Sequence, residues 1–141
     1  MKKYLLIFLF LLVSSRSITA QSYTEIVWTQ IQNAYAENSE NGYSVQNYIV
    51  GKISEEDDNT WSFYLSSSKE YLIEGFCDVD CNDLDLYLSD SDGNQLDSDT
   101  EVDDFPVIYY EPDVTGRYLI KVSMYACEVE PCYFGLAIFE K

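Results

Sequence analysis

The residues best suited to chemistry in this chain are oxygen-bearing side chains next to a cysteine pair. No basic residue occurs between Lys69 and Arg117, and this interval contains Cys77-Asp-Val-Asp-Cys81 with further acids directly after it. Calcium takes about six to eight oxygen ligands from carboxylates, amides and backbone carbonyls. We therefore predict a Ca²⁺ site in this segment, with the ligands Asp78, Asp80, Asn82, Asp83 and Asp85.

The strand expected after this loop places Asp83 and Asp85 on one face, because successive side chains of a strand point to opposite faces. Leu84, Leu86 and Leu88 then occupy the other face. In the alternative interpretation, Asp85 lies on a solvent-facing strand surface and Asp83 caps a turn through its own backbone, with no bound ion.

The first twenty residues have the pattern of a secretory signal peptide. Lys2 and Lys3 precede an apolar run over residues 4–13, and small residues follow at 17–20, just before Gln21. This run is too short to cross a hydrocarbon core about 30 Å thick, and no later segment is continuously apolar for long enough. We predict that residues 1–20 are removed and that the product is secreted, to a periplasm or to the extracellular space, without membrane insertion.

The charge of the chain excludes several classes of partner. The net charge is −17, and it becomes −20 when Lys2, Lys3 and Arg16 leave with the signal peptide, because five basic residues then face 25 acids. Nucleic acids and anionic membranes are bound through lysine and arginine, so neither is expected here. Disorder is excluded as well, because 47% of the residues are hydrophobic and 16% are aromatic.

Four cysteines in an exported chain indicate two disulfides, and the sequence alone does not separate the three connectivities. We favour the local pairs Cys77 with Cys81 and Cys127 with Cys132, since each closes a tight loop between two strand-like segments. The alternative is a zinc site, which requires reduced thiolates and is disfavoured by an oxidising compartment.

A second acidic segment, residues 90–101, has a series of acidic residues like that of a calcium-binding loop. An EF-hand loop that begins at Asp90 requires glycine at its sixth position, where Gln95 stands, whereas Gly93 is fourth. The flanking residues also have the alternation of strands. We therefore predict a hairpin turn at 90–94 that uses Gly93 at positive φ.

Catalysis has little support in the residue types. The chain has no histidine, which removes the usual general base and its pairs with serine or cysteine. Ser66-Ser-Ser-Lys69 matches the serine-lysine pattern of penicillin-binding enzymes, but it stands in a polar turn without the partner motifs. A carboxylate pair of the glycosidase type is the remaining option, and only its spacing in space would identify it. We predict that the protein is not an enzyme.

Aromatic residues form a further set of candidates. The chain has thirteen tyrosines, most of which are expected to fill the core and its rim, with the ring buried and the hydroxyl in water. Alternation directs Tyr118 inward and Tyr87 outward, beside the acidic face. We select Tyr87 and one of Tyr109 and Tyr110 as ligand contacts.

Residue periodicity predicts the elements that carry these side chains. Ser22 and Glu25 fit a capping box, and Tyr23, Val27, Ile31 and Tyr35 recur on one face, so residues 23–37 are predicted to form a helix that the polar stretch 37–42 ends. The period then changes to two, which is typical of strands. The predicted strands lie at 45–53, 61–65, 71–73, 84–88, 107–109, 118–124 and 134–138. They indicate an all-β protein, an antiparallel, jelly-roll-like β-sandwich of about seven to eight strands with a short N-terminal helix.

Residues 43–139 resemble the bacterial pre-peptidase C-terminal domain. The elements that match, in order, are Tyr71-Leu-Ile-Glu-Gly75, Asp83-Leu-Asp-Leu-Tyr-Leu88, the turn at Asp90 to Gly93, and Gly116-Arg-Tyr-Leu-Ile-Lys-Val122. The resemblance implies a small non-catalytic β-sandwich that accompanies secreted hydrolases and, in some members, binds calcium or an extracellular polymer. The chain departs from the family in its two cysteine pairs. The predicted organisation is a signal peptide at 1–20, a helix and connector at 21–42, and the sandwich at 43–141.

These observations favour a secreted, non-catalytic binding or accessory module that binds calcium through an acidic, disulfide-closed loop and takes an extracellular polymer or protein as partner. The alternative is an acidic extracellular structural or interaction protein that recruits a basic partner without a specific metal site. A carboxylate-based hydrolase is the third hypothesis.

Overall fold

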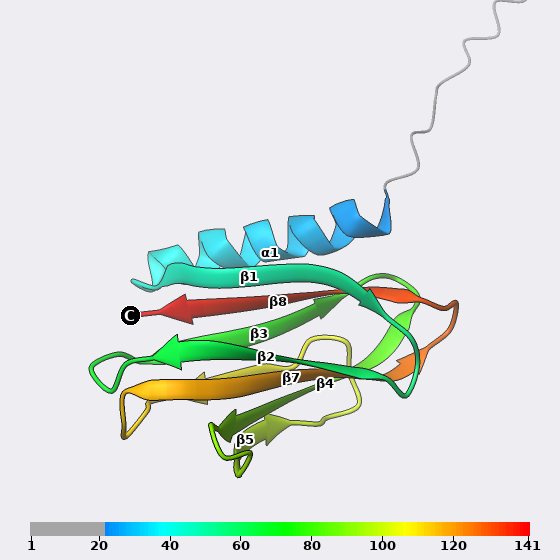
Figure 1. Ribbon diagram of the computed structural model, residues 1–141. Coiled ribbons are helices and arrows are strands. Elements are labelled where there is room, and N and C mark those ends of the chain that lie inside the picture. Colours follow the sequence, from blue (N-terminus) through cyan, green and yellow to red (C-terminus); the bar gives the residue numbers. More distant parts are fainter. Residues whose placement is uncertain (1–21) are drawn as a thin grey trace, which may run out of the picture.

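The computed structural model describes residues 22–141, which form one helix and eight strands (Figure 1). The predicted signal peptide at 1–20 lies outside the described residues. In chain order, the elements are α1 Tyr23–Glu40, β1 Ser44–Ile53, β2 Asp58–Leu65, β3 Tyr71–Cys77, β4 Cys81–Asp90, β5 Gln95–Asp99, β6 Val107–Tyr110, β7 Gly116–Cys127 and β8 Cys132–Glu140.

The strands form two four-stranded antiparallel sheets that pack face to face. One sheet has the order β1-β8-β3-β6 and the other has the order β2-β7-β4-β5. Inward-facing residues of both sheets fill the core between them, among them Leu84 and Leu88 of β4, Ile120 of β7 and Leu136 of β8. The predicted antiparallel β-sandwich is therefore confirmed, with eight strands in the described residues.

Two strands differ from those that the residue periodicity predicts. β5 was not among the predicted strands, because its sequence Gln-Leu-Asp-Ser-Asp lacks an apolar alternation, and it forms by pairing with β4 after the hairpin turn. β3 extends to Cys77, beyond the predicted end at residue 73. All of its residues are buried, since one face meets the sandwich core and the other meets α1, so no polar alternation marks its length.

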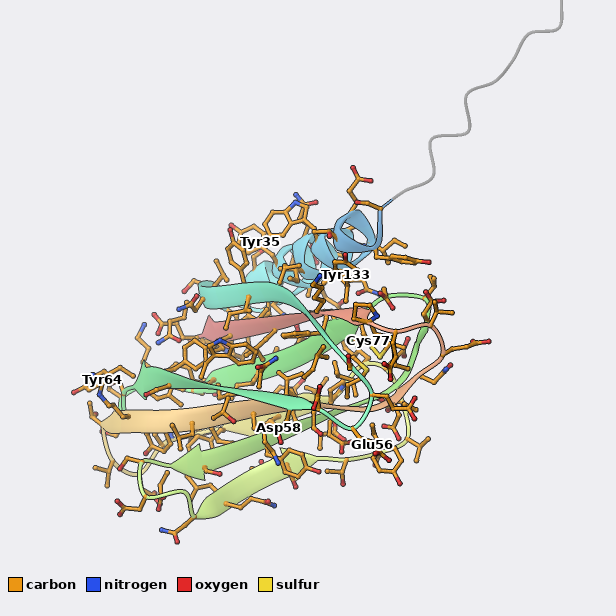
Figure 2. The ribbon with its side chains drawn as sticks, turned by 45° about the vertical axis from the view of Figure 1, so that its right-hand side comes forward. Tyr35, Glu56, Asp58, Tyr64, Cys77 and Tyr133 are labelled. Atoms are coloured by element: carbon orange, nitrogen blue, oxygen red, sulfur yellow. A yellow bond between two sulfur atoms is a disulfide. The ribbon has the colours of Figure 1, made fainter. Side chains whose placement is uncertain are left out.

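The helix begins as predicted and ends later. Ser22 accepts a hydrogen bond from the Glu25 backbone and Glu25 accepts one from Ser22, which completes the capping box. The buried face is Val27, Ile31, Ala34 and Asn38. The predicted places of Tyr23 and Tyr35 on that face were wrong: both are exposed, and Figure 2 shows Tyr35 on the outer side of α1. The helix continues to Glu40 because the polar residue Asn38 faces the sheet. Among residues 22–141, no helix is long and apolar enough to cross a membrane.

The helix lies directly on the outer face of the first sheet (Figure 1). At Gly135 of β8 a Cβ atom would lie 2.8 Å from Val27 Cγ1, so the helix approaches the strand as closely as a glycine allows. Its apolar residues pack with Leu72, Phe76 and Phe139 in a second core. The helix thus covers the middle of this sheet, and a groove remains between α1 and the edge strand β6.

The two ends of the sandwich carry different connections. At one end, which we call the disulfide end, lie the loops 54–57, 78–80, 100–106 and 128–131, on the right in Figure 1. The opposite end carries the loops 66–70, 91–94 and 111–115 together with the C-terminal Lys141.

Candidate functional site

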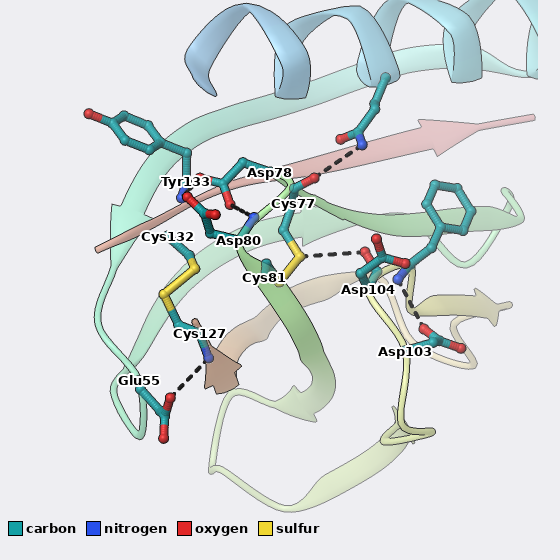
Figure 3. Close-up of a disulfide and its surroundings, with 12 residues drawn as sticks. Glu55, Cys77, Asp78, Asp80, Cys81, Asp103, Asp104, Cys127, Cys132 and Tyr133 are labelled. Atoms are coloured by element: carbon teal, nitrogen blue, oxygen red, sulfur yellow. Dashed lines mark hydrogen bonds between the residues drawn. A yellow bond between two sulfur atoms is a disulfide. The ribbon is translucent and has the colours of Figure 1, made fainter. Parts of the chain in front are cut away.

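Both predicted local disulfides are present. Cys77 is bonded to Cys81 across the β3–β4 loop, and Cys127 is bonded to Cys132 across the β7–β8 loop. No free cysteine remains in residues 22–141, which removes the zinc alternative. Two disulfides favour an extracytoplasmic location. Because Cys81 stands directly opposite Cys127 in the sheet, the two cysteine loops are neighbours (Figure 3).

Asp78 connects the two cysteine loops. Its side chain is buried, Oδ2 accepts a hydrogen bond of 2.7 Å from the backbone N–H of Tyr133, and Oδ1 accepts one of 3.1 Å from the N–H of Asp80 (Figure 3). Its own backbone N–H donates to the carbonyl of Tyr133 at 3.0 Å. One residue therefore fixes the shape of its own loop and binds that loop to the beginning of β8.

Further hydrogen bonds join a third loop to this pair. The Glu128 N–H donates to the carbonyl of Asp80 at 2.7 Å. Glu55, in the β1–β2 loop, accepts from the Cys127 N–H at 3.0 Å and donates its own N–H to a carboxylate oxygen of Glu130 at 3.2 Å. Three loops of the disulfide end are thus held in one arrangement by covalent and hydrogen bonds.

The tips of the cysteine loops present the same pattern, an exposed valine between two acids. Val79 stands between Asp78 and Asp80 with 68% of its surface exposed, and Val129 stands between two glutamates with 58% exposed. Single exposed apolar side chains are ordinary on protein surfaces. Here two lie on neighbouring, covalently closed loops, so they are presented without the ordering cost of a mobile loop. The repetition was visible in the sequence, but the contact between the loops was not.

The loops of the disulfide end carry only negative charge, and Lys52 of β1 is the basic residue that lies beside them. The four loops contain ten acidic residues and no lysine or arginine. These acids are Glu55, Glu56, Asp57, Asp78, Asp80, Glu101, Asp103, Asp104, Glu128 and Glu130. At the opposite end, Lys69 pairs with Glu140 at 2.9 Å and Lys141 pairs with Glu70 at 3.3 Å. The domain is therefore electrically polarised along the strands.

The five predicted calcium ligands lie in two places. Asp78 and Asp80 lie beside Tyr23, whose pKa is raised by its hydrogen bond to Asp80 and by both charges. Asn82 is exposed. Asp83 and Asp85 lie together, and no group of three or more His, Cys, Asp or Glu side chains in residues 22–141 is arranged to hold a metal ion. The calcium site stays a prediction.

The pair on β4 is the more unusual of the two groups. Asp83 is only 6% exposed, and its Oδ1 is buried without a hydrogen-bond partner in the described part of the chain. Burial raises the pKa of Asp83, and the charges of Asp85 and Asp103 raise it further. Asp85 is buried too and accepts a hydrogen bond of 3.0 Å from the Tyr87 hydroxyl. This places two partly desolvated carboxylates side by side on the outer face of the second sheet.

The second acidic segment forms a turn, as predicted, and does not form an EF-hand. Asp90 Oδ1 accepts hydrogen bonds from the N–H groups of Asp92 and Asn94, and Oδ2 accepts from the Asn94 side chain at 2.8 Å. These bonds, the one to the Asn94 side chain foremost, lower the pKa of Asp90. Gly93 has a φ of 87°, which is the positive value that the turn requires.

The serine-lysine pattern has no catalytic geometry. The Lys69 ammonium is bound by Glu140, and the Ser66 hydroxyl lies 2.9 Å from the Ser68 hydroxyl. Both interactions belong to a turn at the surface. The motif is thereby explained as turn structure.

The three selected tyrosines are distributed over both sheets. Tyr87 lies on the outer face of β4, and the Lys121 ammonium is 4.2 Å from its ring centre. Tyr110 packs edge-on against Tyr118, and burial together with that neighbour raises the pKa of Tyr110 to about 12. Tyr109 is exposed on β6 and lines the groove beside α1. Tyr87 lies on the other sheet from Tyr109 and Tyr110, which both line a hollow beside Tyr43 and Tyr71.

The fold defines a class, namely a small antiparallel β-sandwich with the fold of the pre-peptidase C-terminal domain. No family model matches the chain, and no curated protein matches it. Among solved structures, it is similar to the pre-peptidase C-terminal domain of collagenase from Bacillus anthracis. The TM-score is 0.51 and the identity 14%, over 65% of this chain and 87% of that one.

A second solved structure with a similar fold is PliG from Aeromonas hydrophila, a periplasmic inhibitor of g-type lysozyme. Here the TM-score is 0.50 and the identity 11%, over 67% of this chain and 85% of that one. At such identities the similarity concerns the fold. The resemblance noted in the sequence thus agrees with the architecture.

Proposed function

We propose that this protein is an extracytoplasmic, non-catalytic binding protein that captures a basic protein with its disulfide end. The observation that supports the proposal most directly is the pair of cross-linked loops, each with an exposed valine between two acids. The valines supply apolar contact at the centre, and the surrounding carboxylates supply charge complementarity. Full burial of each valine would contribute about 1.5 kcal/mol or more.

The charge distribution suits such a partner. Fields of one sign at a defined surface raise association rates with oppositely charged proteins and disfavour partners of like charge. Since the basic residues other than Lys52 lie in the body or at the opposite end of the domain, a basic protein would approach with the disulfide end in front. Binding should therefore become slower as salt is added.

The partner class can be narrowed by the comparison with PliG, whose name states that it inhibits g-type lysozyme. A small sandwich of this fold can thus act by binding an enzyme. We propose an inhibitor-like role, in which the partner is a basic, secreted hydrolase. The lack of histidine supports a binding role over a catalytic one.

The test measures binding of the protein, residues 21–141, to a g-type lysozyme, with cytochrome c as a basic protein of unrelated shape. We expect Val79→Ser and Val129→Ser to weaken lysozyme binding by about tenfold each, and Glu128→Gln to slow association. Val114→Ser is the matched control, since Val114 is equally exposed at the opposite end. Equal binding of both basic proteins, or equal loss in the Val114 control, would contradict a specific site at the disulfide end.

Calcium binding is a second candidate, and the buried, unpartnered Oδ1 of Asp83 favours it. A cation beside Asp83 and Asp85 would offset the repulsion that raises the pKa of Asp83, with Asp103 as a further carboxylate nearby. Calcium should then raise the melting temperature more than sodium at equal ionic strength, through preferential binding to the folded state. Asp83→Asn should abolish this difference and Asp92→Asn, in the hairpin turn, should not. A calcium response that Asp83→Asn leaves intact would refute this location.

A further inference from the structure

A groove of about 460 Å³ runs between α1 and the outer face of the first sheet, where β3 and β6 are not covered by the helix. This volume lies within the range of about 300 to 1,000 Å³ that is usual for small-molecule sites. Its lining combines polar and apolar side chains, among them Gln30, Glu37, Asn38, Glu74, Phe105 and Tyr109. The cysteine loops take no part in it.

Glu74 is the central polar residue of this groove. It projects from β3 towards α1, it is 7% exposed, and its Oε2 accepts one hydrogen bond of 3.1 Å from the Asn38 amide. No lysine or arginine within residues 22–141 forms an ion pair with it. The pKa of Glu74 is raised to about 7, chiefly by burial. The hydrogen bond from Asn38 lowers this pKa, and the negative charge of Glu37 raises it. The groove therefore contains a carboxyl group that lacks a positive partner.

A second acceptor of the lining, about two helical turns before Asn38 on α1, also lacks a partner. The Gln30 amide donates a hydrogen bond of 3.1 Å to the carbonyl of Cys77, whereas its Oε1 is buried without a partner in the described chain. A buried acceptor without a donor destabilises the fold. Each of these two acceptors would be stabilised by a hydrogen-bond donor of its own.

The walls of the groove are aromatic. The ring of Phe105 packs edge-on against Phe76 with 5.1 Å between centroids, and Tyr109 projects outward from β6 with much of its surface exposed. Rings of this kind attract cations over their faces and pack against flat apolar groups. The same side chains would exclude water from an ion pair with Glu74.

We propose that this groove binds a small organic cation, an ammonium group on a short apolar or aromatic body. The ammonium donates hydrogen bonds to Glu74, and the apolar body packs against Phe105 and Tyr109. No basic side chain lines the groove, which disfavours anionic ligands. Although Phe105 belongs to loop 100–106 of the disulfide end, the groove does not include the cysteine loops that carry Val79 and Val129, and either site can exist without the other.

Binding of such a cation depends on the ionisation of Glu74. The groups that face this carboxyl are Glu37 and Asn38 from α1, Tyr109 from β6 and Phe105 from the preceding loop, while its neighbour on β8 is Ala137. Glu37 is the one other group among them with a charge at neutral pH. Affinity should therefore rise by on the order of tenfold between pH 5.5 and pH 8, as Glu74 loses its proton.

The test uses benzylamine, which stays protonated across this pH range, and benzyl alcohol as its neutral counterpart. NMR titration of residues 21–141 should show benzylamine shifting the amides of α1, β3 and β6, with little effect of benzyl alcohol. Glu74→Gln should weaken benzylamine binding at least tenfold and remove its pH dependence. Glu111→Gln, an exposed acid outside the groove, should change neither.

Three results would overturn the proposal: equal shifts with benzyl alcohol, unchanged affinity in Glu74→Gln, or shifts that map to the cysteine loops 78–80 and 128–131 instead of the groove. Glu74→Gln retains an oxygen acceptor for Asn38 and removes a buried charge, so the variant is expected to fold. Its failure to bind benzylamine would leave lysozyme binding unaffected, and loss of lysozyme binding by Val129→Ser would leave the groove unaffected.

Discussion

Replacement of Glu74 by glutamine should make the protein more stable at neutral and alkaline pH. The folded pKa of Glu74, about 7, lies above its ordinary value of 4.5, because folding buries the carboxyl without a cation. When folding raises the pKa of a carboxyl, the ionised form is less stable in the folded protein than in the unfolded chain. The carboxyl therefore lowers the free energy of unfolding at any pH where it ionises. The cost is absent well below pH 4.5, grows as the pH rises, and is complete above about pH 7. Glutamine keeps the shape and avoids this cost.

The rise in pKa from 4.5 to about 7 is 2.5 pH units, which corresponds to at most about 3.4 kcal/mol. The carboxyl borders a groove that water enters, so part of this cost is screened, and we expect about 1–3 kcal/mol at pH 8. At pH 5 the folded carboxyl is neutral, and the gain should fall below about 1 kcal/mol. For a domain of this size, each 1 kcal/mol is roughly 4 °C in melting temperature.

The assay is urea unfolding of Glu74→Gln and of the parent protein between pH 5 and pH 8, followed by the fluorescence of Trp28 and Trp61. This pH range stays above the isoelectric point of about 4.1. Near its isoelectric point the protein would tend to precipitate. Glu111→Gln removes the same charge from an exposed position and should change stability little at either pH. A difference that is equal at pH 5 and pH 8, or a Glu74→Gln variant less stable at pH 8, would refute the account of a buried, unpaired carboxyl.

Three other substitutions test the structure. Asp78→Ala should lower the free energy of unfolding by about 2–4 kcal/mol, because the backbone N–H groups of Asp80 and Tyr133 lose their acceptor. A loss under about 1 kcal/mol, measured by urea unfolding, would contradict the connecting role of Asp78. Ser22→Ala should cost about 0.5–2 kcal/mol through the lost capping box, measured by thermal unfolding, and no change would mean that the first turn is frayed. Gly135→Ala should cost about 1–3 kcal/mol, since its Cβ would lie 2.8 Å from Val27 Cγ1, and a stabilised variant would show that the helix shifts freely.

Much of the fold could be predicted because most strands have one face in a single core. Leu84, Leu86 and Leu88 alternate with polar residues, and this alternation predicts both the strand and the face that it buries. Where a strand is buried on both faces, as β3 is, or polar on both, as β5 is, the alternation disappears and the pattern fails. The prediction that Tyr23 and Tyr35 lie on the buried face of the helix was wrong for a related reason. Tyrosine is amphipathic, so it occurs on the exposed side of a helix as well as on the buried side.

The sites were harder to predict because they depend on contacts between distant segments. Local spacing was enough for the two disulfides, which close loops of neighbouring residues. It was not enough for the acids of the 77–85 segment, where Asp78 is used by the backbone of Tyr133, far along the chain. Glu74 looked like an ordinary strand acid, because the sequence does not show that Asn38 and α1 lie over it.

Both disulfides lie at one end of the domain, so they affect the shape of the loops there more than the stability of the whole domain. Each bridge spans only four or five positions of the chain, so its loss should cost no more than about 2 kcal/mol of loop entropy. Within each sheet the strands are held by their ladders, and each bridge joins the end of a strand in one sheet to the start of a strand in the other. A reducing environment would therefore loosen the tips that carry Val79 and Val129 while the body stays folded.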